Sequence, residues 1–344
     1  MNTLTIRRPD DFHVHLRRDE RMPVALPHSW HFGRLLVMPN TTPPILNWHD
    51  ATLYVSELCI VRKEEVDDEK WPFLMTIKAT QGMTWPTVKR AHERGVTALK
   101  FYPDTPGEDS VTTGSKGGVC DFFSDNLLAV YNVAQRCGLV CSFHGELADP
   151  TVHPRDRERL FLTTLIKIHE MFPRLRIVLE HVSCKEAVEL IASMPNNVAA
   201  TITAHHLFIT EEDNVDPHNR CMPTAKTRED RAAIRQAAFS GNPSFFFGSD
   251  SAPHWRAAKE NTDKVASGCF TAPVAISLLA TIFETSDHID RLEDFVSAFG
   301  AGFYGFRPNK DTITLVREPW IVPDEYEGIV PFWHGQEIPW KVQE

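Results

Sequence analysis

Two histidines stand one residue apart near the start of the chain, in the stretch DDFHVHLRR from Asp10 to Arg18. In an extended strand successive side chains point to opposite faces, so His13 and His15 would share one face. Two neighbouring imidazoles can hold a metal ion, but they can equally form the polar face of an ordinary strand. The meaning of the pair therefore depends on what the rest of the chain brings beside it.

Four further candidate ligands stand at or near the ends of other apolar runs. They are Lys100 in ALKFYP, His144 in FHGE, His181 in LEHV and Asp250 in GSDSAPH. Four histidines, a lysine and an aspartate together suit zinc or a similar divalent ion. Each short motif is weak alone, because such polar residues are common at strand ends and a buried lysine can simply pair with a carboxylate. The argument depends on whether the fold gathers all six.

Eight apolar, strand-like runs alternate with amphipathic, helix-like segments along the chain. The strand-like runs cover residues 11–16, 34–40, 73–80, 96–103, 139–146, 176–182, 198–206 and 244–250. The helix-like segments cover residues 47–67, 84–95, 125–138, 158–172, 184–194 and 228–241. This alternation predicts an α/β fold, a (β/α)8 TIM barrel. An open doubly wound sheet is the alternative, but it would need a glycine-rich phosphate turn after an early strand, and none is present.

The barrel prediction also sets the expected domain organisation and the position of the site. We expect a single catalytic domain over residues 1–344, with the barrel at about 11–303 and a C-terminal appendage at about 304–344 packed on it. Active sites of such barrels form at the carboxyl ends of the strands. The six candidate ligands would therefore converge on one mouth.

Composition narrows the classes of partner. The formal net charge of −10 argues against a nucleic-acid partner or an anionic membrane surface, because both need an excess of basic residues. The N-terminal stretch carries charges where a signal peptide needs an apolar core, and the longest apolar run, residues 270–283, is shorter than a membrane span. Seven scattered cysteines without a CxxC pair indicate reduced thiols in the cytoplasm and argue against zinc held by thiolates.

The motifs HVHLR, VMPNTTPP, LKFYP, HGE, EH, TAHHLF and GSDSAPH resemble those of the dihydroorotases, in the amidohydrolase superfamily, and more narrowly the shorter type found in many bacteria and fungi. The resemblance runs in order from about Arg7 to beyond Phe303. It implies the reversible, zinc-dependent interconversion of N-carbamoyl-L-aspartate and L-dihydroorotate in pyrimidine (UMP) biosynthesis, a small dicarboxylic substrate, and a homodimer. Two alternatives stay open: a hydantoinase- or lactonase-like hydrolase with the same metals, and a non-catalytic scaffold of the superfamily.

The resemblance also implies a role for each candidate ligand. His13, His15 and Asp250 would hold one of two Zn²⁺ ions, and His144 and His181 would hold the other. Lys100, carboxylated on its amine by carbon dioxide, would bridge the two ions as N6-carboxylysine. A hydroxide shared by the metals would attack the ring amide in the hydrolytic direction, with Asp250 as the proton shuttle.

Further residues would bind the substrate if the resemblance holds. Arg17, Asn40 and His254 match the family's contacts to the substrate carboxylate, with His15 beside them, and the main chains of Met222 and Ser267 would contact the ring. Thr112 and Thr113, in the loop 103–119, would fold over the substrate. Glu146 and Glu180 are candidates to orient ligand histidines. His205 and His206 are pocket-wall candidates, and the alternative, which we favour, is that each is a buried, hydrogen-bonded histidine.

Overall fold

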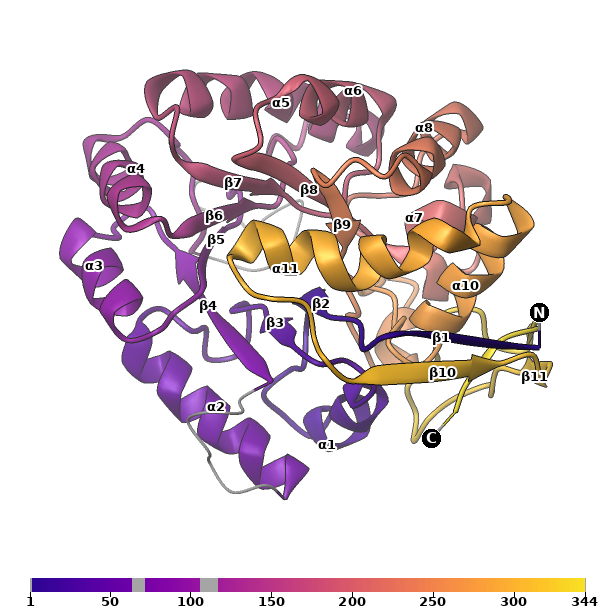
Figure 1. Cartoon of the computed structure of the whole chain (residues 1–344). Helices are drawn as coiled ribbons and strands as arrows, with labels where there is room; N and C mark the ends of the chain where they lie inside the picture. The colour runs from indigo at the N-terminus through magenta and orange to yellow at the C-terminus, as the bar shows by residue number, and fades with distance from the viewer. Residues whose placement is uncertain (1, 64–71, 106–116, 344) are drawn as a thin grey trace.

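The computed structural model describes residues 2–63, 72–105 and 117–343. Its centre is one sheet of eight parallel strands that follow one another in sequence order (Figure 1). The strands are β2 (Asp11–Val14), β3 (Leu35–Val37), β4 (Phe73–Ala79), β5 (Ala98–Phe101), β6 (Val140–Phe143), β7 (Arg176–Leu179), β8 (Val198–Ile202) and β9 (Phe245–Phe247). Backbone hydrogen bonds from Asp250 N to the His13 carbonyl (2.8 Å) and from His15 N to the Ser251 carbonyl (2.9 Å) join the last strand's exit to β2. The predicted barrel and its eight strands are confirmed.

Helices surround this sheet on the outside (Figure 1). The longer ones are α2 (Trp48–Arg62), α3 (Trp85–Glu93), α4 (Asp125–Cys137), α5 (Pro154–Met171), α6 (Lys185–Ser193), α8 (Arg228–Phe239) and α10 (Ala275–Thr285). The shorter ones are α1 (Met22–Ala25), α7 (Ala204–Phe208), α9 (Arg256–Lys259) and α11 (Phe299–Tyr304). Every helix-like segment expected from the sequence forms a helix, and of the segment 47–67 the structure describes the part up to residue 63.

Residues that favour the ends of helices are found at the ends of several helices in the structure. The Asn47 side chain accepts hydrogen bonds from the first backbone amides of α2, and Thr227 with Asp230 forms a capping box at the start of α8. Gly138 ends α4 in the left-handed conformation, with φ of 72°, which glycine adopts without steric cost. Local chemistry therefore sets where several helices begin and end around the barrel.

The period of two along the strands places apolar and polar layers inside the barrel. Ala98, Val140, Val178 and Ala199 form part of one apolar interior cluster with Phe12 and Phe246. Two residues further along β5, β6, β7 and β8 stand buried polar side chains: Lys100, Ser142, Glu180 and Thr201. The intervening residues, such as Leu99 and Cys141, pack in the core that includes the helices. One end of the barrel is therefore an apolar floor, and polar groups gather toward the carboxyl ends.

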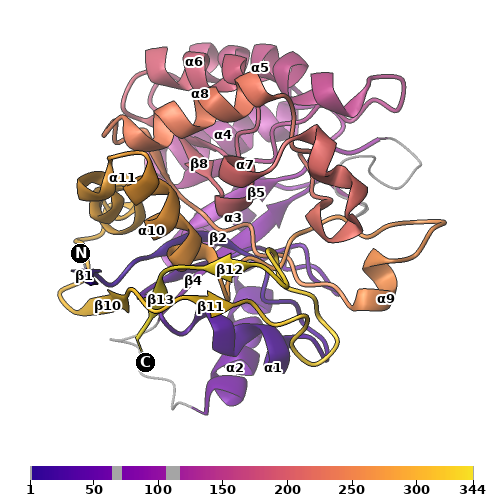
Figure 2. The ribbon, with the colours of Figure 1, turned by 90° about the vertical axis from the view of Figure 1, so that its right-hand side faces the viewer.

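A second, smaller sheet lies beside the barrel and joins both ends of the chain (Figures 1 and 2). β1 (Thr3–Arg7) pairs antiparallel with β10 (Thr312–Val316), which also pairs with β13 (Lys341–Val342). β11 (Trp320–Ile321) pairs with β12 (Glu337–Ile338). The fully buried Trp340 donates a hydrogen bond of 3.0 Å to Glu284 on α10. The C-terminal segment is thus built together with residues 3–7, which the sequence did not indicate. Among the described helices, none has the length and apolar character that a membrane span requires.

Candidate active site

A cavity of about 150 Å³ opens at the carboxyl ends of the barrel strands. It is lined by His13, His15, Arg17, Asn40, Tyr102, His144, His181, Met222, Asp250, Ala252, His254, Ser267 and Gly268. Of the site residues expected from the sequence to line the cavity and described by the structure, all do so except Lys100, His205 and His206. Lys100 is fully buried on β5, two residues before Tyr102. Thr112 and Thr113 lie outside the described residues.

The first group of candidate ligands joins β2 to the exit of β9. Asp250 Oδ1 lies 3.3 Å from His13 Nε2 and 3.2 Å from His15 Nε2. All three side chains are buried, and their ligand atoms lie within 4.8 Å of one another. These three donors come from opposite ends of the barrel sequence, and closure of the barrel brings them together.

The second group lies at the exits of β6 and β7. His144 Nδ1 stands 3.2 Å from His181 Nε2, and the two rings lie with their centroids 4.7 Å apart. The ring of His13 is the link to the first group, with its centroid 5.1 Å from that of His181. The two groups are therefore adjacent parts of one cluster of imidazoles and a carboxylate.

Backbone strain is concentrated at this mouth. Among the described residues, seven that are not glycine have positive φ, and Arg17 (61°), His181 (42°) and Asp250 (44°) are three of them. Such conformations cost of order 1–3 kcal/mol each and persist where the surrounding structure enforces them. The strain indicates that the side-chain directions here are under functional constraint.

Two buried glutamates set which nitrogen of each histidine faces the cavity. Glu180 Oε2 lies 2.8 Å from His13 Nδ1, and Glu146 Oε2 lies 2.7 Å from His144 Nε2. A carboxylate that accepts the proton of one ring nitrogen leaves the lone pair of the other available to a metal. His13 therefore presents Nε2 and His144 presents Nδ1. Both glutamates contact ligand histidines as expected, but Glu180 contacts His13 rather than its neighbour in sequence, His181.

Lys100 brings an amine without a partner into this cluster. Its Nζ is buried and has no hydrogen-bond partner among the described residues. Burial lowers the pKa of Lys100 to about 8, although Glu180 and Asp250 act in the opposite direction. A buried, unpaired ammonium is costly, so the environment raises the fraction of Lys100 that is present as the neutral amine. This is the state in which a lysine can react with carbon dioxide.

The electrostatics of the first group favour deprotonated donors. Burial lowers the pKa of His15 to about 4, and the contact with Asp250 only partly offsets this. Burial alone would raise the pKa of Asp250, but the charges and hydrogen bonding of His13 and His15 outweigh it and hold that pKa far below the usual range. A neutral His15 imidazole and an ionised Asp250 carboxylate are the protonation states in which these two groups can bind a metal.

The spacing of these donors fits metal ions. Metal–nitrogen bonds of about 2.0–2.1 Å at tetrahedral angles place two ligand atoms about 3.3 Å apart. The three measured contacts, from Asp250 to His13 and His15 and from His144 to His181, are 3.3, 3.2 and 3.2 Å. Together with the unpaired amine of Lys100, this shows that the residues present fit a metal centre.

The same cavity also offers groups that bind carboxylates. Arg17 Nε donates to the Pro253 carbonyl (2.9 Å), and Arg17 Nη2 lies 2.9 Å from His254 Nε2. His254 Nε2 also lies 3.0 Å from the carbonyl of Ser267. The Asn40 Oδ1 atom is buried without a hydrogen-bond partner among the described residues. Burial lowers the pKa of Arg17 to about 10, so this guanidinium stays charged at neutral pH.

The structure adds two residues that the sequence analysis missed. Tyr102 lines the cavity, and its ring centroid lies 5.4 Å from Lys100 Nζ. Its position two residues after Lys100 in LKFYP was the signal, since side chains two residues apart in an extended chain point to the same side. Arg21 Nη1 lies 3.3 Å from the Pro253 carbonyl and 3.5 Å from His254 Nδ1. Nothing in its sequence context pointed to this contact.

The expectation for the histidine pair after β8 is half correct. His206 is buried and hydrogen-bonded, with Nδ1 2.8 Å from Thr203 Oγ1 and Nε2 3.1 Å from the Pro223 carbonyl. His205 is also buried, but neither of its ring nitrogens has a hydrogen-bond partner among the described residues. The expected hydrogen bond of His205 was therefore wrong, because the ring faces other imidazoles and apolar side chains instead of a carbonyl.

A barrel of this topology, with imidazoles, a buried lysine and an aspartate at its mouth, defines the class of metal-dependent amidohydrolases. No protein-family model matches the chain. The chain is, however, 40% identical over 357 residues to a dihydroorotase of Teredinibacter turnerae, a match that covers 99% of each protein. The chain therefore belongs to the dihydroorotase family.

Solved structures agree. A dihydroorotase of Saccharomyces cerevisiae in complex with 5-fluoroorotic acid has a TM-score of 0.90 and 31% identity, and the match covers 100% of this chain and 99% of the yeast chain. A dihydroorotase of Campylobacter jejuni has a TM-score of 0.89 and 31% identity, covering 100% and 98%. The function is accordingly that of a hydrolase acting on a cyclic amide bond.

Proposed function

We propose that the chain catalyses the reversible cyclisation of N-carbamoyl-L-aspartate to L-dihydroorotate with two Zn²⁺ ions per subunit. The observation that carries this proposal is the construction of the cavity. Its lining combines donors at metal-ligand spacing with Arg17, Asn40 and His254, which suit a carboxylate. A ring with a cyclic amide and a carboxylate would contact both sets of groups.

The candidate metal ligands form two sets and a bridge. His13, His15 and Asp250 would hold one ion, and His144 and His181 the other. When bound, the ions lower the pKa of water and polarise the amide carbonyl. Lys100 would supply the bridge, since its neutral amine forms a C–N bond to carbon dioxide and releases one proton. The product would be a carbamate anion, which would supply oxygen ligands to the ions.

Asp250 is suited to carry the proton of the reaction. Its carboxylate is held ionised by His13 and His15, and it borders the cavity. In the hydrolytic direction it would accept a proton from water and deliver it to the ring nitrogen that leaves the carbonyl carbon. In the biosynthetic direction it would take the proton back from that nitrogen. The strained φ of Asp250 supports a fixed position for this transfer.

The substrate carboxylate that takes no part in the chemistry would bind at Arg17 and its neighbours. Arg17 offers a charged fork, and Asn40 and His254 stand beside it. The main chains of Met222 and Ser267 line the same cavity and would contact the ring. The yeast relative was solved with 5-fluoroorotic acid, a pyrimidine carboxylate, which supports a carboxylated ring as the ligand class. Thr112 and Thr113 stay predicted contacts.

Three further properties belong to this proposal. Residues 1–344 would act as one catalytic unit, since the relatives align over the full length of the chain. The enzyme would act in the cytoplasm, because all seven cysteines are free. It would form a homodimer, as the resemblance to the family implies.

The test combines metal analysis with a turnover assay. We expect two equivalents of zinc in the candidate active site and reversible conversion of dihydroorotate by the purified protein. Bound metal with cleavage of hydantoins or lactones, but not of dihydroorotate, would assign the site to another cyclic amide or ester. A protein that binds no metal and turns over none of these rings would be a scaffold, and the proposal would be wrong.

A further inference from the structure

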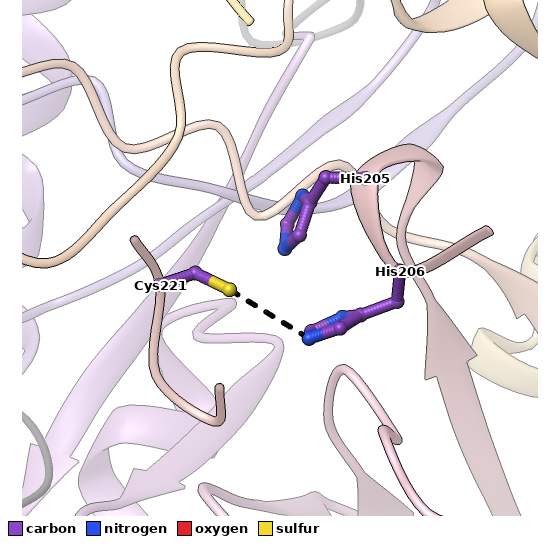
Figure 3. Close-up of side chains that lie close together, drawn as sticks. All are labelled: His205, His206 and Cys221. Carbon is purple, nitrogen blue, oxygen red and sulfur yellow. Dashed lines mark hydrogen bonds between the residues drawn. The ribbon is translucent and has the colours of Figure 1, made fainter. Parts of the chain in front are cut away.

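A second group of potential metal ligands lies next to the active site. His205 and His206 stand on α7, directly after β8, and Cys221 stands in the loop after a short 3-10 turn (Pro217–Asn219). All three are buried, and one ligand atom from each lies within 4.8 Å of the others. Figure 3 shows both imidazoles and the thiol pointing toward one another from the facing helix and loop.

His205 is the residue that calls for an explanation. Its side chain is fully buried, and neither ring nitrogen has a hydrogen-bond partner among the described residues. Leaving a buried imidazole nitrogen without a partner costs of order 1–3 kcal/mol. The nearest rings are that of His206, with its centroid at 4.4 Å, and that of Phe332 at 6.2 Å. A cation coordinated by one His205 nitrogen would give that nitrogen a partner.

His206 and Cys221 already stand at ligand spacing. Cys221 Sγ lies 3.7 Å from His206 Nε2. A Zn²⁺ ion with bonds of about 2.3 Å to sulfur and 2.05 Å to nitrogen at a tetrahedral angle places these atoms about 3.6 Å apart. The geometry therefore needs little adjustment to accept an ion.

The protons of this cluster can rearrange to allow binding. His206 Nε2 and Cys221 Sγ both face the Pro223 carbonyl, at 3.1 and 3.2 Å, and each can donate a proton to it. On metal binding the His206 proton would move to Nδ1, where Thr203 Oγ1 lies 2.8 Å away and can accept it. The Cys221 thiol would release its proton to solvent, so each ion bound would release one proton.

The donor types select the kind of ion. Two imidazoles and one thiolate suit Zn²⁺ or a similar borderline ion, whereas Mg²⁺ and Ca²⁺ need oxygen ligands. Cys269 lies beside Cys221, and its hydrogen bond and burial raise the pKa of the Cys221 thiol. This arrangement departs from the expectation drawn from cysteine spacing, because the ligands meet through the fold and not through a short motif.

We propose that His205, His206 and Cys221 form a third metal site, for Zn²⁺, distinct from the two sites of the active centre. The ion would tie α7 to the loop that carries Met222, the residue after Cys221, which lines the substrate cavity. Its role would be to hold this wall of the cavity in place. The third site shares no ligand with the active centre, so its test does not depend on the outcome of the test of the proposed function.

Cobalt substitution of the unmutated holoenzyme tests this without altering the chain. None of the six proposed active-site ligands contains sulfur, so Co²⁺ bound there gives no thiolate-to-metal charge transfer. Co²⁺ in the proposed third site gives such a band in the near ultraviolet. Zinc analysis should show three equivalents per chain, and anomalous diffraction at the zinc edge should show a peak between His205 and Cys221.

Two variants and a matched control locate the site. Cys221→Ala and His205→Gln should each retain two equivalents of zinc and lose the charge-transfer band, whereas Cys184→Ala, which removes another buried thiol at the start of α6, should keep three equivalents and the band. Absence of the band in the unmutated protein overturns the proposal. A charge-transfer band that persists in both variants also overturns the proposal, because the thiolate would then lie elsewhere, for example at the exposed Cys120.

Discussion

Replacing Glu180 with glutamine should weaken metal binding on the His13 side of the active centre. Glu180 is fully buried and acts as an acceptor for three donors: His13 Nδ1 at 2.8 Å, Thr201 Oγ1 at 2.6 Å and the Ser142 hydroxyl. Glutamine keeps the shape but has only one acceptor atom. Its amide would therefore turn a donor toward at least one of these donors.

The size of the effect follows from the bond to His13. A hydrogen bond to a charged group contributes about 1.5–3 kcal/mol, which corresponds to about a 10- to 150-fold change in an equilibrium constant. Without the carboxylate, His13 can also place its proton on Nε2, the atom that faces Asp250 and would bind the metal. Loss of such an orienting partner typically lowers metal affinity by about 10- to 100-fold, in agreement with this figure.

The assay is a competition titration of the metal-depleted protein against a chromophoric chelator, followed by turnover at saturating zinc. The matched control is Glu57→Gln, which removes a carboxylate paired with Arg18 at the surface, with contacts of 2.6 and 2.7 Å. We expect the control to bind zinc as the unmutated chain does. If Glu180→Gln binds both ions with affinities within twofold of the unmutated chain, the orienting role derived from the structure is wrong.

Four further outcomes test the remaining parts of the site and the fold. Asp250→Asn should keep most of its metal but lose turnover by about a hundredfold or more, because an amide cannot carry the proton; near-normal rates would remove Asp250 from that role. Lys100→Ala should lose the bridge and regain part of its activity with added short carboxylic acids, and full activity without an additive would contradict bridging. Arg17→Met should raise KM at unchanged zinc content, so an unaltered KM would argue against the carboxylate contact. Burial lowers the pKa of His31 from 6.5 to about 3, so the stability of its neutral state is present above about pH 6.5 and is lost as the pH falls toward 3. When the pH is lowered from 6.5 to 5, the free energy of unfolding measured in urea should fall in both proteins, but by about 1–2 kcal/mol less in His31→Gln than in the unmutated chain. Equal decreases in the two proteins would refute this prediction.

Much of the fold was accessible from local pattern. Each barrel strand is a short apolar run between turn residues, and several helices carry amphipathic spacing or capping residues such as Asn47 and Gly138 at their ends. The strand at residues 3–7 was not predicted, because the strand with which it pairs, residues 312–316, lies at the other end of the chain. A single strand of alternating character does not reveal with which strand it pairs.

The candidate site, too, was predictable from the sequence only in part. The ligand residues could be chosen in advance because they stand at strand ends, and parallel strands bring their carboxyl ends to one rim. Which donors would meet across that rim was not determined by the sequence. The pairing of Glu180 with His13, the approach of Arg21 to His254, and the meeting of His205 with Cys221 all join segments that are distant along the chain.

The physical reason lies in the range of the interactions involved. Backbone sterics, hydrophobic period and capping act over a few residues, so the sequence by itself determined the order of strands and helices and the polarity of each strand end. Distances between side chains on different strands depend on barrel closure, strand register and the packing of every layer between them. Only the tertiary structure therefore decided which nitrogen of each histidine faces the cavity, and that His205 is buried without a hydrogen bond beside a thiol.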